Sequence, residues 1–245
     1  MEIFFEIHTD LPREGPGDNA STRKALALME DLPEHPRILD LGCGPGVQTR
    51  ELARVTGGMV TAVDTHQPFL DRLEAIARQE GLAPHIKTLN QSMDALDLPN
   101  AGFDVIWSEG AIYIVGFREG LADWKRLLKP GGCIAVTEIS WIKSDPPQEV
   151  AAFWENAYPA MGSVKGNLET IEELGYRLLG HFTLPETCWT EEYYAPMVER
   201  VAMLRQKYAD DAEKQAALDE ELLEVELYEK YSAWYGYEFY VMQKQ

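Results

Sequence analysis

The sequence has few cysteines, few basic residues and no long apolar run. Its three cysteines, Cys43, Cys133 and Cys188, are too few and too scattered for a disulfide framework or a zinc site, so no metal and a cytoplasmic location are expected. Lys and Arg number 22 against 41 Asp and Glu, and this net charge of −19 argues against nucleic acid as a partner. No apolar run approaches the roughly 20 residues that cross a bilayer, and the first residues lack the basic and apolar regions of a signal peptide. We therefore expect no membrane partner.

What the sequence does contain is an alternation of short apolar segments with helical ones. Its 245 residues, 45% of them hydrophobic, are enough for one large domain with a full core. The pattern predicts strands near residues 38–41, 59–63, 85–89, 103–107, 133–139, 176–184 and 237–241. Helices are expected between them, including 146–161, 167–174 and an acidic helical stretch at about 186–232. Such alternation predicts an α/β fold with a doubly wound, mostly parallel sheet covered on both faces.

A glycine-rich loop follows the first predicted strand and opens a helix. Gly42, Gly44 and Gly46 are spaced G-x-G-x-G, whereas a dinucleotide fingerprint would place its third glycine at position 47, which is Val47. Pro45 also lacks the N–H that a pyrophosphate would use at a helix N-terminus. The loop therefore favours a nucleoside ligand without a diphosphate, and it argues against an NAD-dependent oxidoreductase, the first alternative.

Asp64 stands at the end of the second predicted strand, eighteen residues after Gly46. A carboxylate at that strand tip can accept hydrogen bonds from both ribose hydroxyls. Together with the loop, it predicts a ribose site.

These residues resemble the class I S-adenosylmethionine-dependent methyltransferases, and in particular a small-molecule subgroup. The matching elements are Asp40 with Gly42, Gly44 and Gly46, then Asp64, then residues 91–94, 103–107 and 128–132. The resemblance implies a Rossmann-like sheet of seven strands with the last one antiparallel, and S-adenosylmethionine as cofactor. It implies a single domain over 1–245, with an arm and helix at 1–34, a cofactor-binding core at 35–140 and acceptor-side elements at 141–245.

The resemblance also implies positions for the three parts of the cofactor. Asp64 would hold the ribose, and the adenine would meet Ser92 and Met93, with Thr65 or His66 against one face. The amino-acid end would lie over Gly42 and Gly44, beside Ser108 and Glu109. Asp40 would organise the loop or receive the cofactor ammonium.

The implied reaction is transfer of a methyl group to a small soluble metabolite by in-line displacement. The segment 108–111, Ser-Glu-Gly-Ala, does not resemble the motif of enzymes that methylate amino groups of bases. The expected acceptor pocket is formed by Arg13, Glu109, Tyr113, Glu138 and Trp141, with further aromatic walls from Trp154, Tyr158, Trp189, Tyr193 and Tyr194. The catalytic residue, the acceptor atom and the oligomeric state, a homodimer included, are left open by the sequence. A non-catalytic S-adenosylmethionine-binding protein is the second alternative.

Residues 9–20 form a turn-rich arm that carries Arg13. An arm with so little apolar content is suited to a lid that orders over bound cofactor and excludes water. The alternative is that apolar residues before it, such as Ile3 and Ile7, pack on the core and make the segment structural.

Overall fold

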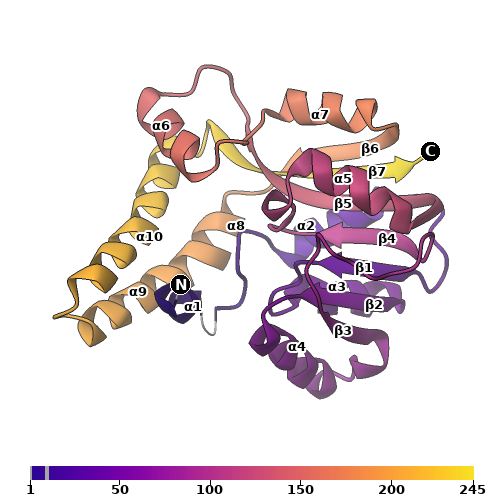
Figure 1. Ribbon diagram of the computed structural model, residues 1–245, viewed down its shortest axis with the longest axis horizontal. Helices are drawn as coiled ribbons and strands as arrows, with labels where there is room; N and C mark the ends of the chain where they lie inside the picture. The colour runs from indigo at the N-terminus through magenta and orange to yellow at the C-terminus, as the bar shows by residue number, and fades with distance from the viewer. Residues whose placement is uncertain (1, 9–10) are drawn as a thin grey trace.

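A seven-stranded sheet forms the centre of the molecule (Figure 1). The computed structural model describes residues 2–8 and 11–245, and the order of the strands in its sheet is β3-β2-β1-β4-β5-β7-β6. The strands are β1 (Arg37–Leu41), β2 (Met59–Asp64), β3 (Ile86–Asn90), β4 (Phe103–Ser108), β5 (Leu128–Trp141), β6 (Tyr176–Thr183) and β7 (Tyr235–Lys244). The pairs among β1 to β5 are parallel, and β7 is antiparallel to both β5 and β6. The predicted doubly wound sheet with an antiparallel last strand is confirmed.

Helices cover both faces of this sheet. The helices between α1 (Glu2–His8) and β5 in the sequence are α2 (Asn19–Ala27), α3 (Val47–Thr56), α4 (Gln67–Gln79), η1 (Ala83–His85), η2 (Ile112–Ile114), α5 (Phe117–Trp124) and η3 (Lys125–Leu127). Alternate side chains of a strand point to opposite faces. Ile38 and Val60 therefore pack on the side of α2 and α3, whereas Leu39 packs on the side of α5 and α7 (Val164–Glu173).

The strand order creates a crevice between β1 and β4. The chain runs outward from β1 through β2 to β3 and then returns to place β4 on the other side of β1. The connections on the two sides of that point leave in opposite directions, so ligands of such sheets bind there, beyond the carboxyl ends of the strands. The glycine loop after β1 and the segment after β4 are thus brought to one place.

A helical lobe extends from the sheet beyond β6 (Figure 1). It consists of α8 (Thr187–Trp189), the π-helical η4 (Thr190–Tyr194), α9 (Ala195–Lys207) and α10 (Ala212–Tyr231), with α6 (Gln148–Ala157) above it. The acidic stretch expected to be helical at 186–232 is therefore a hairpin of two main helices.

The N-terminal helix α1 (Glu2–His8) packs on this lobe. Ile7 is buried, the Glu6 carboxylate pairs with Lys207, and Arg200 Nε donates to the Glu6 carbonyl at 3.0 Å. Residues 11–18 then run without regular structure toward the sheet, as expected for the arm, whose residues 9 and 10 lie outside the described part. Over residues 2–8 and 11–245, no helix is both long enough and apolar enough to cross a membrane.

Strand β5 begins earlier than the sequence predicts. The sequence predicts this strand at 133–139, yet β5 starts at Leu128 and includes Pro130 and Gly131. The pairing with β4 shifts register between Phe103 and Val105 at this point. Such an irregularity accommodates a proline that has no N–H for the ladder.

Candidate active site

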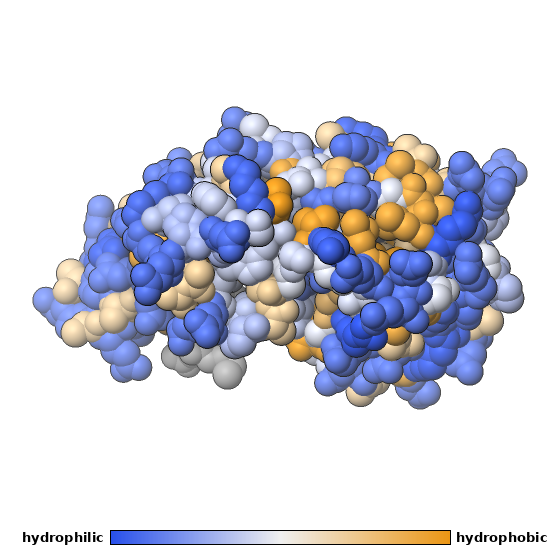
Figure 2. Space-filling model, turned by 90° about the horizontal axis from the view of Figure 1, so that it is seen from above, coloured by the Kyte–Doolittle hydropathy of each residue, from blue (hydrophilic) through white to orange (hydrophobic). Residues whose placement is uncertain are grey.

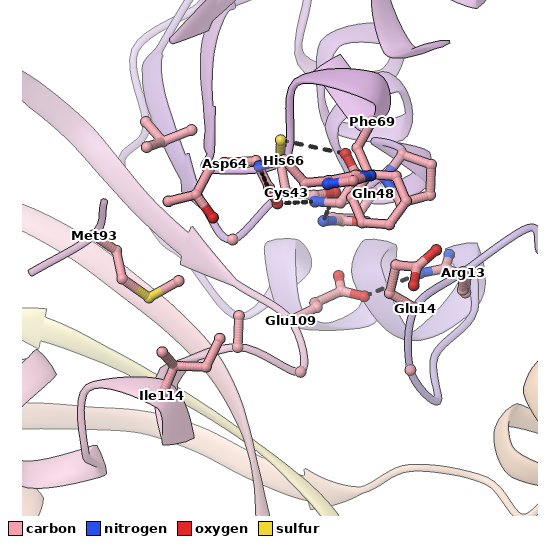
Figure 3. Close-up of a pocket in the computed structure, with 18 of the residues that line it drawn as sticks. Arg13, Glu14, Cys43, Gln48, Asp64, His66, Phe69, Met93, Glu109 and Ile114 are labelled. Atoms are coloured by element: carbon pink, nitrogen blue, oxygen red, sulfur yellow. Dashed lines mark hydrogen bonds and ion pairs between the residues drawn. The ribbon is translucent and has the colours of Figure 1, made fainter. Parts of the chain in front are cut away.

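A cavity of about 290 Å³ opens at the crevice beyond β1, β2 and β4 (Figure 3). Its walls come from the arm, the glycine loop, the ends of β2 and β3, and the segment after β4. The predicted site residues that line it are Arg13, Gly42, Gly44, Asp64, Thr65, His66, Ser92, Met93, Glu109 and Tyr113. Residues separated by up to 100 positions are thus brought together where the strand order predicts a ligand.

The glycines of the loop are required by its geometry. Gly42, Gly44 and Gly46 have φ values of +69°, +52° and +76°, a region that favours glycine. A Cβ on Gly42 would overlap the Ala111 side chain, and one on Gly44 would lie 3.3 Å from Glu14 Cγ. Gly42 and Gly44 therefore keep the floor of the cavity open.

Gly46 has a different position. It is the N-cap of α3, and a Cβ there would overlap the Leu73 side chain of α4. It does not line the cavity. Gly46 allows α3 and α4 to pack closely beneath the loop.

Asp64 ties the two loops of the site together. Its Oδ2 accepts a hydrogen bond from the Gly44 N–H at 2.9 Å, and its Oδ1 accepts one from the His66 N–H at 2.8 Å. Each oxygen keeps lone-pair capacity, since a carboxylate can accept about four hydrogen bonds. The carboxylate is thus fixed at the cavity wall and can still accept from a ligand.

The adenine-side residues line the same end of the cavity. The His66 ring packs edge-on against Phe69, with 4.5 Å between the ring centroids. Trp124 Nε1 donates to the Met93 carbonyl at 3.1 Å and so anchors the segment after β3 to α5. The side chains of Thr65, Ser92 and Met93 carry no charge, as a nucleobase face requires.

Glu109 is held by three donors from three parts of the chain. Its Oε1 accepts from Trp107 Nε1 at 2.8 Å and from Thr22 Oγ1 at 2.7 Å, and its Oε2 pairs with Arg13 Nη1 at 3.3 Å. Arg13 Nη2 in turn donates to Asn19 Oδ1 at 2.9 Å. Figure 3 shows Arg13 and Glu109 facing each other, and this ion pair fastens the arm to the end of β4.

Asp40 and Ser108 lie behind the cavity wall rather than on it. Asp40 is fully buried and its Oδ2 accepts from Thr49 Oγ1 at 2.5 Å, while burial raises the pKa of this carboxyl to about 7. Ser108 Oγ donates to the Leu41 carbonyl at 2.9 Å. In this position both side chains support the strand ends that carry the loop.

The predicted acceptor residues divide into two groups. Tyr113 lines the cavity and packs edge-on against Tyr158, with 5.9 Å between centroids. Glu138 lies behind this pair, and its Oε1 accepts from the Tyr158 hydroxyl at 2.8 Å. Trp141 is turned away and packs against Tyr235, with 6.2 Å between ring centroids.

Several lining residues were missed by the sequence analysis. They are Glu14, Gly15, Pro16, Gln48, Phe69 and Ile114, together with Gln91 of the quoted segment 91–94. Gln48 and Phe69 lie in the first turns of α3 and α4, the helices that follow β1 and β2. Their place at the start of a helix after a sheet strand is the signal that could have identified them.

The comparisons with known proteins agree with this geometry. Residues 38–132 match the family model described as a methyltransferase domain. The chain is 35% identical over 114 residues to a dimethylglycine N-methyltransferase of Parasynechococcus marenigrum. The aligned region covers 46% of this chain and 41% of that protein. It is 30% identical over 161 residues to a 2-methyl-6-phytyl-1,4-hydroquinone methyltransferase of Synechocystis sp., over 60% of this chain and 48% of that one. The chain thus spans about half the length of the curated relatives it matches.

Similar structures extend the likeness of the fold over the whole chain. A methyltransferase of Geobacter sulfurreducens, crystallised with S-adenosyl-L-homocysteine, superposes with a TM-score of 0.85 at 22% identity and covers 100% of this chain and 98% of its own. The sheet, the glycine loop and the matching domain define a Rossmann-like methyltransferase fold. Residues 38–132 thus match a methyltransferase domain, and the whole chain has the fold of the class I S-adenosylmethionine-dependent methyltransferases.

The residues present fit the cofactor of this family, S-adenosylmethionine. The floor at Gly42 and Gly44 has no side chains, and Asp64 offers a fixed carboxylate to a diol. The Gln91 Oε1 atom is buried without a hydrogen-bond partner among the described residues, so the cavity wall holds an acceptor for a ligand N–H. Within residues 2–8 and 11–245, no group of three or more His, Cys, Asp or Glu side chains could hold a metal ion.

Proposed function

We propose that the protein transfers the methyl group of S-adenosylmethionine to a small-molecule acceptor. The observation that carries this proposal is one cavity with two different ends. One end has the side-chain-free loop and Asp64, which suit a nucleoside, and the other has Glu109 and Tyr113, with Tyr158 packed against Tyr113. A nucleoside site alone would not need the second end.

The chain's own residues contribute binding, orientation and exclusion of water. When bound, the cofactor supplies a sulfonium methyl group that is transferred by in-line displacement, so the protein mainly positions two reactants. Asp64 fixes the ribose end, and the loop at Gly42 and Gly44 lets the ligand approach the backbone closely. The Arg13–Glu109 pair closes the arm over the opening, which keeps water from the reacting atoms.

The acceptor class follows from the site and not from the relatives alone. The relatives include a dimethylglycine N-methyltransferase and a 2-methyl-6-phytyl-1,4-hydroquinone methyltransferase, which are named for different acceptors. A cavity of about 290 Å³ is of the size that holds a small molecule. We infer a small metabolite and no nucleic acid partner.

The test is calorimetry of the purified protein with S-adenosylhomocysteine and with NAD, followed by a metabolite screen with isotope-labelled cofactor. We expect binding of S-adenosylhomocysteine, no binding of NAD, and transfer of label to a small acceptor. Binding of NAD alone would favour the oxidoreductase alternative. Binding of S-adenosylhomocysteine without label transfer to any metabolite in a cell extract would favour the non-catalytic alternative.

We propose that residues 1–245 work as one methyltransferase domain. Strand β7 follows the helical lobe in sequence, yet it is inserted between β5 and β6. The lobe therefore begins and ends at strands of the same sheet, which supports an insertion and not a second domain.

We also propose a reducing compartment, the cytoplasm. Cys43, Cys133 and Cys188 are free thiols in separate parts of the core. Burial raises the pKa of Cys133 to about 11 and that of Cys188 to about 12, so both stay protonated and unreactive.

A further inference from the structure

Behind the cavity lies a buried carboxylate that lacks a counter-charge. Glu138 on β5 is 1% exposed, and its Oε1 accepts from the Tyr158 hydroxyl. Its Oε2 is buried and has no hydrogen-bond partner among the described residues. Leaving one oxygen of a buried carboxyl group unsatisfied is costly, so such an atom marks a place where a ligand can supply the partner.

A second carboxylate approaches from the helical lobe. Glu224 on α10 accepts a hydrogen bond from the Tyr194 hydroxyl at 2.8 Å, and burial raises its pKa. The charge of the nearby Glu221 raises this pKa further, whereas His8 lowers it. Within the described part of the chain, neither Glu138 nor Glu224 forms an ion pair with a Lys or Arg.

Tyrosine rings connect these carboxylates to the cavity. Tyr113 lines the cavity and packs edge-on against Tyr158. Burial raises the pKa of its phenol, and the negative charges of Glu224 and Glu138 raise it further. Burial also raises the pKa of the Tyr237 phenol, and the charges of the same two carboxylates add to this effect. The Tyr237 hydroxyl lies 3.9 Å from where a Cβ on Gly110, another cavity residue, would be. Tyr113 therefore lines the acceptor end of the cavity with Tyr158 and Glu138 directly behind it, the Tyr237 hydroxyl lies near Gly110, and the negative charge of Glu224 influences both Tyr113 and Tyr237.

We propose that the acceptor is a small amine, bound as a cation between the tyrosine rings with its positive charge toward Glu138 and Glu224. This deepens the proposed function and rests on it. Aromatic faces attract cations, and carboxylates supply the opposite charge. An anionic acceptor would be repelled here, and a neutral one would leave Glu138 without a partner.

The same arrangement accounts for the proton that an amine must lose. An ammonium group has no lone pair, so one of its protons must leave before the nitrogen can react, and Glu138 Oε2 is the unpartnered oxygen that can accept it. The nitrogen lone pair then forms the new N–C bond while the S–C bond breaks, and the electron pair of that bond stays on sulfur. The products are the methylated ammonium ion, a neutral thioether and the protonated carboxyl group, so the positive charge of the sulfonium ends on nitrogen.

The test measures the preference for a cation over its neutral isostere in the protein loaded with S-adenosylhomocysteine. The probe pairs are choline with 3,3-dimethyl-1-butanol, n-butylamine with n-butanol, and 2-phenylethylamine with 2-phenylethanol. We expect at least one cation to bind about ten-fold or more tightly than its isostere. Equal binding within every pair, or no binding of any cation, would overturn the proposal.

Charge-removing variants locate the preference. Glu138→Gln keeps the acceptor for the Tyr158 hydroxyl and should reduce the cation preference at least several-fold while the neutral isostere binds as before. Glu224→Gln, at a half-buried position, should also reduce the cation preference. It provides the test if the Glu138→Gln variant does not fold. Glu226→Gln removes an exposed charge from the same helix and should leave the preference unchanged. A preference that survives both buried substitutions would place the cation elsewhere and refute the assignment.

The outcome is separable from that of the proposed function. Failure to bind S-adenosylhomocysteine would refute the proposed function, and the cation preference can still be measured in the unloaded protein. Binding of S-adenosylhomocysteine together with label transfer only to alcohols, acids or thiols would support methyl transfer and overturn the amine.

Discussion

At the scale of single residues, Asp64 combines a structural and a binding role. Its two oxygens accept from the Gly44 and His66 amides and so hold the glycine loop and the start of α4 in place. The proposed ribose contact would use the remaining lone pairs of the same carboxylate. A substitution must therefore keep the size of the side chain if it is to test the ligand contact.

We expect Asp64→Asn to weaken the affinity for S-adenosylhomocysteine about ten- to a hundred-fold. Hydrogen bonds to a charged group contribute on the order of 1.5–3 kcal/mol, and the amide cannot accept on both sides. Titration calorimetry measures the change. Asp71→Asn, on the exposed face of α4, is the matched control and should bind as the wild type does. An unchanged affinity for the Asp64 variant would place the ribose elsewhere.

Two buried acids give a prediction for the pH dependence of stability. Burial raises the pKa values of Asp40 and Glu138 to about 7, above those in an unfolded chain. The folded state then binds more protons than the unfolded state between about pH 4 and pH 7. Stability should be greatest near the lower end of this window, fall as pH rises to about 7, and level off above it. Over this window each group contributes roughly 3–4 kcal/mol, at about 1.4 kcal/mol per pKa unit.

Thermal unfolding at pH 5.5 and pH 8.5 measures this effect. The wild type should have the higher melting temperature at pH 5.5, and the double variant Asp40→Asn, Glu138→Gln should show a smaller difference. Some dependence should remain, because burial also raises the pKa values of Glu221 and Glu224. A wild type that is more stable at pH 8.5 would contradict the assignment of these two acids.

At the scale of elements, the arm over residues 11–18 forms one wall of the cavity. Arg13, Glu14, Gly15 and Pro16 line it, and Arg72 Nη1 donates to the Leu11 carbonyl at 2.9 Å. The preceding helix α1 packs on the lobe with Ile7 in the core. Both sequence alternatives therefore have a place in the structure: the apolar start is structural, and the arm after it covers the site.

Deleting residues 1–17 should consequently destabilise the protein, so limited proteolysis is the cleaner test of a lid. Arg13 is 6% exposed and paired with Glu109, so trypsin can cut there only when the arm opens. S-adenosylhomocysteine should slow this cleavage, because a ligand that contacts the closed arm stabilises the closed state. Cleavage at Lys165, which is exposed on α7, is an internal control that the ligand should not change. Equal rates at Arg13 with and without ligand would argue against a lid.

The elements differ in how far the sequence could predict them. The strands near the site were predictable because each is a short apolar run between turn residues, and the loop was predictable because Gly42 and Gly44 must adopt positive φ. The electrostatic influence of Glu224 on Tyr113, which are 111 residues apart, depends on how the helical lobe packs beside the site. No local pattern encodes that influence, since it results from packing of the lobe.

At the scale of the whole molecule, the surface is largely polar and the chain has a net charge of −19. Figure 2 shows hydrophilic residues over most of the helical lobe and around the edge of the sheet half. Many ion pairs lie at the surface, for example Arg118 with Glu173 and Lys165 with Glu169, and exposed pairs contribute little to stability. The excess of 41 acids over 22 bases therefore leaves the molecule with net self-repulsion.

We expect added salt to stabilise the protein because screening weakens this repulsion more than it weakens the exposed ion pairs. The screening length falls to about 10 Å at 0.1 M salt, shorter than the spacing of charges on opposite ends of the lobe helices. The melting temperature should rise by about 2–4 °C between 10 mM and 200 mM NaCl, which corresponds to roughly 1 kcal/mol for a chain of this size. A variant in which the exposed Glu213, Glu220, Glu226 and Glu229 of α10 are changed to Gln should melt higher at 10 mM and respond less to salt. A melting temperature that falls with salt would mean that the ion pairs outweigh the repulsion, and the net charge would then not be what limits stability.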